Sequence, residues 1–368
     1  MRLAASLQTQ ARSASGGGAG GSRQAGAPCG AGAEGRDDED TAEDPAAPPP
    51  RYDENGKYIG PGTEAIPYRH ATYEGLVYLP YVRKHLLDRM RSENELLERD
   101  IVVASFPKTG TTWLQTVLLS LVMGGPERLR DPMRQSVWIE AAVCRRKCTC
   151  DEFMDGWGAI RGVLPEQRVL KTHAQAHVAP WVGCADPTML RACGAKLAIT
   201  WRDPRDVAVS CFHHITASNA YRYRGTWDEF IEMFLAGGTE GGDFWEWQLG
   251  WRRATAKAVR SGDAMWVRYE DMKADLPGMV RRLQAFAGLP PDEELVRRTA
   301  EAGEFGAMRA LFERRNVRKL ANGKKFNAEH IRKGEVGGFD ELMTEEQSQE
   351  FQRRTAQLEA QLHAEGLL

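Results

Sequence analysis

The chain has 368 residues, enough for one large domain or two ordinary ones. Its 42% hydrophobic and 27% charged residues are ordinary proportions for a soluble globular protein. A formal net charge of -2 gives no global attraction to nucleic acid or an anionic membrane, and no run reaches the ~18 apolar residues of a membrane helix. Seven cysteines, an odd number, favour a reducing compartment over a disulfide framework.

Residues 1–51 differ from the rest of the chain. Residues 1–36 are rich in Ala, Gly and Ser and carry four arginines against one acidic residue, Glu34; an acidic run and a proline run follow. Such a segment has too few large apolar side chains to offset its ordering entropy, so we expect a disordered tail. A transit peptide is the alternative, although the glycine runs weaken its amphipathic pattern. We therefore expect a cytoplasmic protein, or an organelle-targeted one, with a folded domain over residues 52–368.

Short β-rich runs alternate with helical patterns along that domain. The strands are expected within 99–107, 168–173, 195–204 and 264–271, and the helices over 112–123, 206–214, 227–236 and 278–287. This alternation predicts an α/β fold with a central, mostly parallel sheet flanked by helices. Ligands bind beyond the carboxyl ends of strands in such sheets, and the motifs below fall at those ends.

The stretch IVVASFPKTGTTWLQ, residues 101–115, has the form of a strand, a phosphate-binding turn and a helix. Its lysine precedes the glycine, whereas a P-loop has the lysine after its second glycine. The backbone N–H groups that open the helix would face an anion in the turn. The side-chain donors are Lys108, Thr109, Thr111 and Thr112. Metal-linked nucleotide chemistry expects an acidic residue at a neighbouring strand end, but Arg202 stands there, so the loop predicts an anion site without a metal.

Four segments in this order resemble the motifs of the cytosolic-type sulfotransferases, which use 3′-phosphoadenosine 5′-phosphosulfate (PAPS). They are FPKTGTTW at 106–113, LKTHA at 170–174, WRDPRDVAVSCFHH at 201–214 and IRKGEVGGF at 331–339. The resemblance covers most of residues 70–360. It implies one α/β domain around a P-loop-like PAPS-binding core, a small-molecule hydroxyl or amine acceptor, and no metal.

The resemblance places a catalytic base at His173. Lys171 and His173 are two residues apart on a predicted strand, so their side chains would share a face. A neutral imidazole can accept the acceptor's proton near neutral pH. Lys108 and Lys171 would supply positive charge to the moving group. His177 is the nearby competitor and matches no family motif, while His213 and His214 are expected to pack or to line the acceptor pocket.

Further residues would hold the nucleotide. The 5′-phosphosulfate loop comprises Lys108, Thr109, Gly110, Thr111 and Thr112. The 3′-phosphate clamp comprises Arg202, Ser210, Arg332, Lys333 and Gly334, and Ser210 would also restrain Lys108. The adenine side comprises Trp113, Tyr269, Phe305 and Met308. The family's T-S-F-x-x-M segment here has Gly303 and Glu304 in place of its hydroxyl residues, and a carboxylate near a polyanion would repel it unless turned outward.

Two more segments bear on partners. The family's short dimerisation motif is altered to Asp340 and Glu345, which predicts a monomer or a non-standard dimer. Residues 344–364 after it predict a charged amphipathic helix. CRRKCTC at 144–150 has three cysteines but no second ligand pair for zinc, so we expect free thiols in a basic loop, which could flank the acceptor entrance.

Two other classes of protein remain alternatives to a PAPS-dependent sulfotransferase. A P-loop kinase is disfavoured by the position of Lys108 and by the lack of a strand-end acid. A catalytically silent nucleotide-binding relative is suggested by Gly303 and Glu304. The retained Lys108, Lys171, His173 and Ser210 argue against it.

Overall fold

The computed structural model describes residues 50–52, 58–61, 71–73, 76–78, 96, 98–142, 167–179, 194–217, 221, 223–321 and 331–368. The expected N-terminal tail, apart from residues 50 and 51, and the cysteine-rich segment at 144–150 lie outside these ranges.

The strands in chain order are β1 (Pro50–Tyr52), β2 (Tyr58–Pro61), β3 (Ala71–Tyr73), β4 (Leu76–Tyr78), β5 (Ile101–Ser105), β6 (Val137–Trp138), β7 (Val169–Thr172), β8 (Lys196–Trp201) and β9 (Ala264–Arg268). The α-helices are α2 (Thr111–Val122), α3 (Pro132–Gln135), α4 (Ile139–Ala142), α7 (Pro204–Ala217), α8 (Trp227–Leu235), α9 (Phe244–Ser261), α10 (Tyr269–Ala274), α11 (Leu276–Phe286), α12 (Glu293–Gly303), α13 (Phe305–Ala321) and α14 (Glu345–Ala364). Short 3₁₀ helices are η1 (Pro126–Arg128), η2 (Ala176–Val178) and η4 (Gly338–Glu341).

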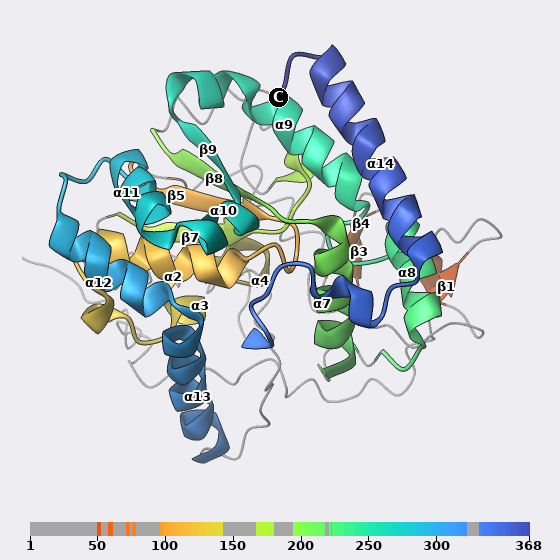
Figure 1. Ribbon diagram of the computed structural model, residues 1–368, viewed down its shortest axis with the longest axis horizontal. Coiled ribbons are helices and arrows are strands. Elements are labelled where there is room, and N and C mark those ends of the chain that lie inside the picture. The colour runs from red at the N-terminus through yellow and green to blue at the C-terminus, as the bar shows by residue number, and fades with distance from the viewer. Residues whose placement is uncertain are drawn as a thin grey trace, which may run out of the picture. The chain divides into compact units, whose positions relative to one another are not determined.

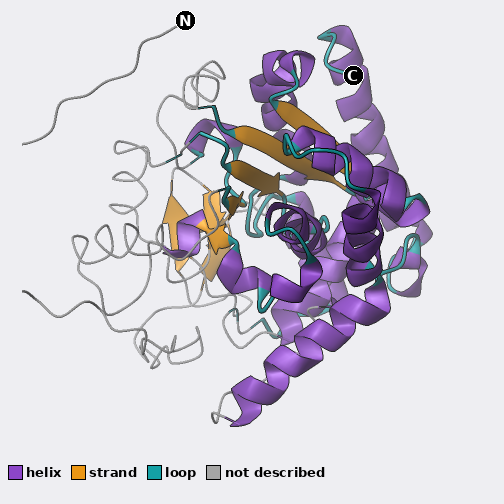
Figure 2. Cartoon of the chain, turned by 90° about the vertical axis from the view of Figure 1, so that its left-hand side faces the viewer, coloured by secondary structure: helices purple, strands orange, loops and turns teal. Residues whose placement is uncertain are grey.

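A five-stranded sheet in the order β6-β7-β5-β8-β9 forms the centre of the domain, and each neighbouring pair of its strands is parallel. Figure 2 shows these strands side by side with helices around them. Two antiparallel hairpins, β1-β2 and β3-β4, precede the sheet in the chain. The predicted α/β class and parallel sheet are confirmed, as are the four expected strands and four expected helices.

Helices cover both faces of the sheet (Figure 1). Strand β5 is buried along its whole length, which explains why it is a continuous apolar run with no polar alternation. Val103 packs in one hydrophobic cluster with residues of α2, α11 and α12. Its neighbour Ala104 belongs to the other cluster, with residues of α7, α8, α9 and α14. Successive side chains of the central strand thus anchor two layers of helices.

The predicted C-terminal helix is confirmed as α14. Thr344 accepts a hydrogen bond from the backbone N–H of Gln347, and the Gln347 side chain bonds back to the Thr344 backbone, forming a capping box. Glu345 lies in the first turn, where a negative charge stabilises the helix dipole. The acidic substitution in the family's dimerisation segment therefore has a role within the chain; the oligomeric state remains a prediction.

Because the strands of the sheet are parallel, the carboxyl ends of β5, β7 and β8 lie at the same edge of the sheet. In register, Ala104 of β5 pairs with Thr172 of β7, and Ser105 pairs with Thr200 of β8. The segments that follow, beginning at Phe106, His173 and Arg202, therefore emerge side by side. Among the described helices, none has the length and apolar character that a membrane crossing requires.

Candidate functional site

The turn between β5 and α2 has an unusual backbone conformation that packs closely on Tyr269. Lys108 has φ +73° and Gly110 has φ +99°, and the first of these is a conformation that side-chain-bearing residues adopt rarely. A Cβ on Gly110 would lie 2.8 Å from the Tyr269 ring. Gly110 is also the N-cap of α2, whose first turn has no acidic residue. Helix N–H groups at such an end attract anions.

The Thr109 and Thr111 hydroxyls of this loop are engaged within the protein. The Thr109 hydroxyl donates to the Phe106 carbonyl at 2.7 Å and contacts the Thr200 hydroxyl. The Thr111 and Ser105 hydroxyls are 2.8 Å apart. These side chains hold the turn against β5 and β8. The Thr109 backbone N–H also donates to the Phe106 carbonyl, at 3.3 Å.

Lys108 lies half-buried among other cations. Burial lowers the pKa of Lys108 to about 8, and the charges of Arg202, Lys171 and Arg332 add to this effect. An ammonium surrounded by like charges is destabilised until a polyanion enters. Clustered cations of this kind suit a multiply charged anion.

His173 follows β7 and is buried beside the start of the loop. Its Nδ1 is 2.7 Å from the Ser105 carbonyl oxygen, so Nδ1 is the donor and the lone pair is left on Nε2. Lys171 Nζ is 3.4 Å from Nε2 and 4.2 Å from the centre of the Trp138 ring. Burial, with the charges of Lys171 and Lys108, holds the pKa of His173 well below its usual value. The imidazole is thus neutral at neutral pH, as a general base requires.

The end of β7 is held by residues outside the predicted set. Glu140 Oε1 accepts hydrogen bonds from the Thr172 hydroxyl at 2.7 Å and from the backbone N–H groups of His173 at 2.8 Å and Ala174 at 2.9 Å. The Trp247 indole N–H donates to the His173 carbonyl at 3.1 Å. Glu140 follows β6, a strand of two residues too short to recognise from sequence, so no local pattern predicted this support.

His177 and His214 lie in surroundings that differ from those of His173. His177, the competitor, is exposed in η2. His214 lies on α7 with its ring centre 5.6 Å from that of Tyr221. Burial and the charges of Lys108, Lys171 and His173 lower its pKa well below the usual value. His214 therefore lies near the site, in keeping with the expected packing or pocket role.

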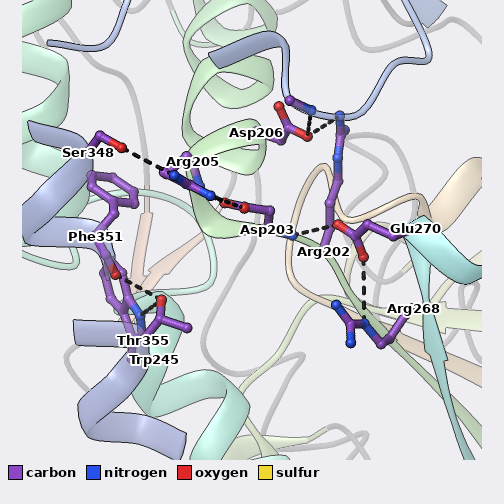
Figure 3. A network of polar contacts seen from close by, with 11 residues as sticks. Arg202, Asp203, Arg205, Asp206, Trp245, Arg268, Glu270, Ser348, Phe351 and Thr355 are labelled. Carbon is purple, nitrogen blue, oxygen red and sulfur yellow. Dashed lines mark hydrogen bonds and ion pairs between the residues drawn. The ribbon is translucent and has the colours of Figure 1, made fainter. Parts of the chain in front are cut away.

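Arg202 links the end of β8 to the segment after residue 331. Its Nη2 donates to the Glu335 carbonyl at 2.8 Å and lies 3.5 Å from Asp206 Oδ2. Asp206 also accepts the backbone N–H of Gly337 at 3.0 Å. Figure 3 shows this arrangement and, beside it, Glu270, which accepts the Asp203 backbone N–H at 2.9 Å. The two predicted phosphate segments, far apart in sequence, are thus joined by the Arg202–Glu335 hydrogen bond and by the buried Asp206 carboxylate, which the sequence did not single out.

The RKG segment also meets the predicted adenine segment. Gly334 has φ +67°, and a Cβ there would overlap the Phe305 ring. Met308, one turn along α13, is buried. Lys333 is ion-paired with Glu341. Glu304, which precedes α13, is exposed, and its orientation toward a bound nucleotide stays a prediction.

Aromatic side chains complete this side. The Trp113 and Tyr269 rings meet edge to face with centres 5.1 Å apart, and the Arg202 guanidinium lies 4.2 Å from the Tyr269 centre. Trp113 Nε1 is buried with no hydrogen-bond partner among the residues described. Gly303 approaches it closely, because a Cβ there would lie 3.4 Å from Nε1. A larger residue at 303 would crowd the indole.

Ser210 is half-buried on α7, eight residues after Arg202. Its neighbour Cys211 bonds to the Pro107 carbonyl at 3.7 Å, which places this turn of α7 against the phosphate-binding turn. The Ser210 hydroxyl makes no hydrogen bond within the described ranges. The structure thus gathers Lys108, Lys171, His173 and Arg202 at one edge of the sheet, with α7 beside them.

Comparisons with known proteins agree on one family. The family model described as "Sulfotransferase domain" matches residues 98–363. The chain is 25% identical over 291 residues to sulfotransferase 6B1 of Mus musculus, covering 77% of this chain and 84% of that protein. Two solved structures share the fold. Mouse sulfotransferase SULT7A1 complexed with PAP has a TM-score of 0.58 at 22% identity, covering 77% of this chain and 93% of that one. Retinol dehydratase in complex with androsterone and inactive cofactor PAP has a TM-score of 0.59 at 22% identity, covering 74% and 84%.

Proposed function

The chain belongs to the sulfotransferase domain family and is a sulfotransferase, and from this premise we propose that it moves a sulfuryl group from PAPS to a hydroxyl or amine of a small-molecule acceptor. Transfer is in-line, with His173 as the general base. The observation that carries this proposal is the geometry of His173, whose Nδ1 is fixed by the Ser105 carbonyl 2.7 Å away and whose Nε2 carries the lone pair beside Lys171.

The residues present fit the donor molecule. Gly110 packs so closely on Tyr269 that a Cβ would lie 2.8 Å from its ring, and it opens the N-terminus of α2, which has no side-chain cap. Three cations, Lys171, Arg202 and Arg332, act electrostatically on Lys108 at this edge. When bound, PAPS supplies the sulfuryl group and a phosphate leaving group. Such clustered positive charge suits a polyanion and needs no metal.

Each catalytic group has one task in this proposal. His173 Nε2 takes the proton from the acceptor's hydroxyl or amine. Lys108 and Lys171 hold fixed positive charge where negative charge accumulates during transfer, as in phosphoryl transfer. Ser210 contacts the 3′-phosphate and restrains Lys108 until the acceptor arrives; its place on α7, beside Cys211 and the Pro107 carbonyl, supports this role.

The nucleotide roles divide between the two ends of the site. Thr109, Gly110, Thr111 and Thr112 surround the 5′ side through their loop. The 3′-phosphate is bound by Arg202, Ser210, Arg332, Lys333 and Gly334, with Lys333 exchanging its partner Glu341 for the phosphate. Adenine lies among Trp113, Tyr269, Phe305 and Met308. The contact of Gly334 with Phe305 supports a shared site for phosphate and base.

The domain bounds, the cellular location, the oligomeric state and the partners are also proposals. Residues 52–368 form the sulfotransferase domain, and the protein acts in the cytoplasm, or in an organelle if the N-terminal tail is a targeting segment. It is a monomer or a non-standard dimer. Neither nucleic acid nor a membrane is among its partners.

A binding experiment tests the donor assignment directly. Arg202 is proposed to bind a 3′-phosphate that ADP lacks, so the wild-type protein should bind 3′,5′-bisphosphoadenosine at least roughly tenfold more tightly than ADP. Arg202→Ala should remove most of this preference, whereas Lys108→Ala should weaken both nucleotides. Arg253→Ala, which removes an exposed pair with Glu365, is the matched control. Equal affinities in the wild type, measured by calorimetry, would contradict the proposal.

A turnover experiment tests the base. His173→Ala should nearly abolish sulfuryl transfer and leave bisphosphate binding almost intact, because the imidazole acts on the acceptor. Activity should survive EDTA. Metal-dependent transfer, from ATP instead of PAPS, would favour the kinase alternative.

A further inference from the structure

One buried carboxylate near the base has no role in the chemistry above. Glu240 lies in the glycine-rich loop 236–243 between α8 and α9. A Cβ on Gly241 would lie 3.0 Å from the Phe106 ring and 3.1 Å from Pro107. The Gln175 amide donates to the Gly241 carbonyl at 3.1 Å. The loop is therefore packed between the phosphate-binding turn and the segment that follows His173.

Glu240 is buried close to several of the groups that are proposed to act in sulfuryl transfer. Its exposed fraction is 8%. The Tyr221 hydroxyl donates to Oε2 at 2.8 Å, and the Tyr221 ring meets His214 edge to face. The positive charges of the Lys171 and Lys108 ammonium groups act on the carboxylate. Within the described part of the chain, the hydrogen bond from Tyr221 is made to Oε2 and not to Oε1.

A carboxylate in this position is unfavourable without a further donor. Burial raises the pKa of Glu240 to about 7, with hydrogen bonding from Tyr221 and the positive charge of Lys171 acting in the opposite direction. A buried charge is stabilised by a hydrogen-bonded partner of opposite sign. The cations of this edge, Lys108, Lys171 and Arg202, would repel a cationic acceptor. Asp206 lies beside Arg202, and Glu140 accepts hydrogen bonds at the end of β7, while Glu240 offsets the positive charge on the Tyr221 side.

We propose that Glu240 is a specificity-determining residue that binds the ammonium group of an acceptor whose hydroxyl is presented to His173. The acceptor class is thus a hydroxyl-bearing primary amine. This inference rests on the proposed sulfuryl transfer and narrows its acceptor. The competing role for Glu240 is charge balance for Lys171 alone, which would affect all acceptors alike.

Matched acceptors separate these roles. Tyramine and 4-ethylphenol differ by an ammonium group, as do 6-aminohexan-1-ol and hexan-1-ol. Transfer from labelled PAPS and binding to the complex with 3′,5′-bisphosphoadenosine are measured for both pairs. We expect the wild-type protein to prefer the amine of at least one pair by roughly ten- to hundredfold, the effect of one hydrogen bond to a charged group.

Two variants complete the test. Glu240→Gln keeps an oxygen for the Tyr221 hydroxyl but removes the charge, and it should abolish the amine preference without weakening bisphosphate binding. Tyr221→Phe keeps the carboxylate and should retain the preference. The inference is overturned if neither amine is preferred in binding or turnover, or if Glu240→Gln changes both members of a pair equally. Bisphosphate affinity and transfer to the neutral acceptors report separately on the proposed function.

Discussion

Replacing Gly334 by alanine tests whether the RKG segment and the adenine segment form one nucleotide site. Gly334 has φ +67°, and a Cβ there would overlap the Phe305 ring. The left-handed conformation costs a side-chain-bearing residue ~1–2 kcal/mol, and forcing an aromatic ring aside costs a further ~1–3 kcal/mol. This conformation of the loop should therefore be destabilised by about 2–5 kcal/mol, and because the proposed nucleotide site requires it, the affinity for 3′,5′-bisphosphoadenosine should fall more than tenfold.

The same loop provides the control. Gly337 has φ +79° with no atom within 4 Å of a built Cβ, so Gly337→Ala carries the backbone cost alone, ~1–2 kcal/mol. Calorimetric titration of both variants isolates the Phe305 contact as the difference between them. Equal affinities for Gly334→Ala and Gly337→Ala would refute the reasoning, because the clash would then have no effect on nucleotide binding.

Three further predictions concern protonation, positioning and stability. Burial lowers the pKa of Lys108 to about 8 and that of His173 well below 6.5. The value of kcat/KM for PAPS should therefore fall above pH 8, where Lys108 loses its charge. It should also fall in acid, where His173 gains a proton. Lys108→Arg stays charged and should remove the alkaline fall; its persistence would contradict the assignment. Asp206→Asn keeps an acceptor for the Gly337 N–H but removes the negative charge that positions Arg202. Binding of the bisphosphate should therefore weaken by ~1 kcal/mol, roughly fivefold, while binding of ADP should change little. Tighter binding of the bisphosphate would show that Asp206 only competes with the phosphate for Arg202. Thr344→Ala removes the α14 cap and should lower the free energy of unfolding by ~0.5–2 kcal/mol in urea titrations, whereas an unchanged midpoint would mean that tertiary packing alone holds the helix start.

The sequence predicted those residues of the candidate site that come directly after a strand. Lys108, His173 and Arg202 each come within three residues of the end of β5, β7 or β8, and parallel strands bring such residues to one edge. The predictions were incomplete where a role depends on a partner distant in sequence. Thr109 and Thr111 were expected as side-chain donors to the anion, but the hydroxyls they meet belong to β8 and β5.

The sequence alone determined the α/β class, the positions of β5, β7, β8 and β9, of four helices among them and of α14, and the set of anion-binding motifs, because apolar runs, glycine turns and caps act locally. Only the tertiary structure decided which polar groups meet across the chain. Glu140 supports His173 over 33 residues of separation, and Asp206 reaches Gly337 over 131. Glu240 stands beside Tyr221 because a glycine-rich loop packs on Phe106. Such contacts follow from the order of strands in the sheet and from the burial of charge, which no local pattern specifies.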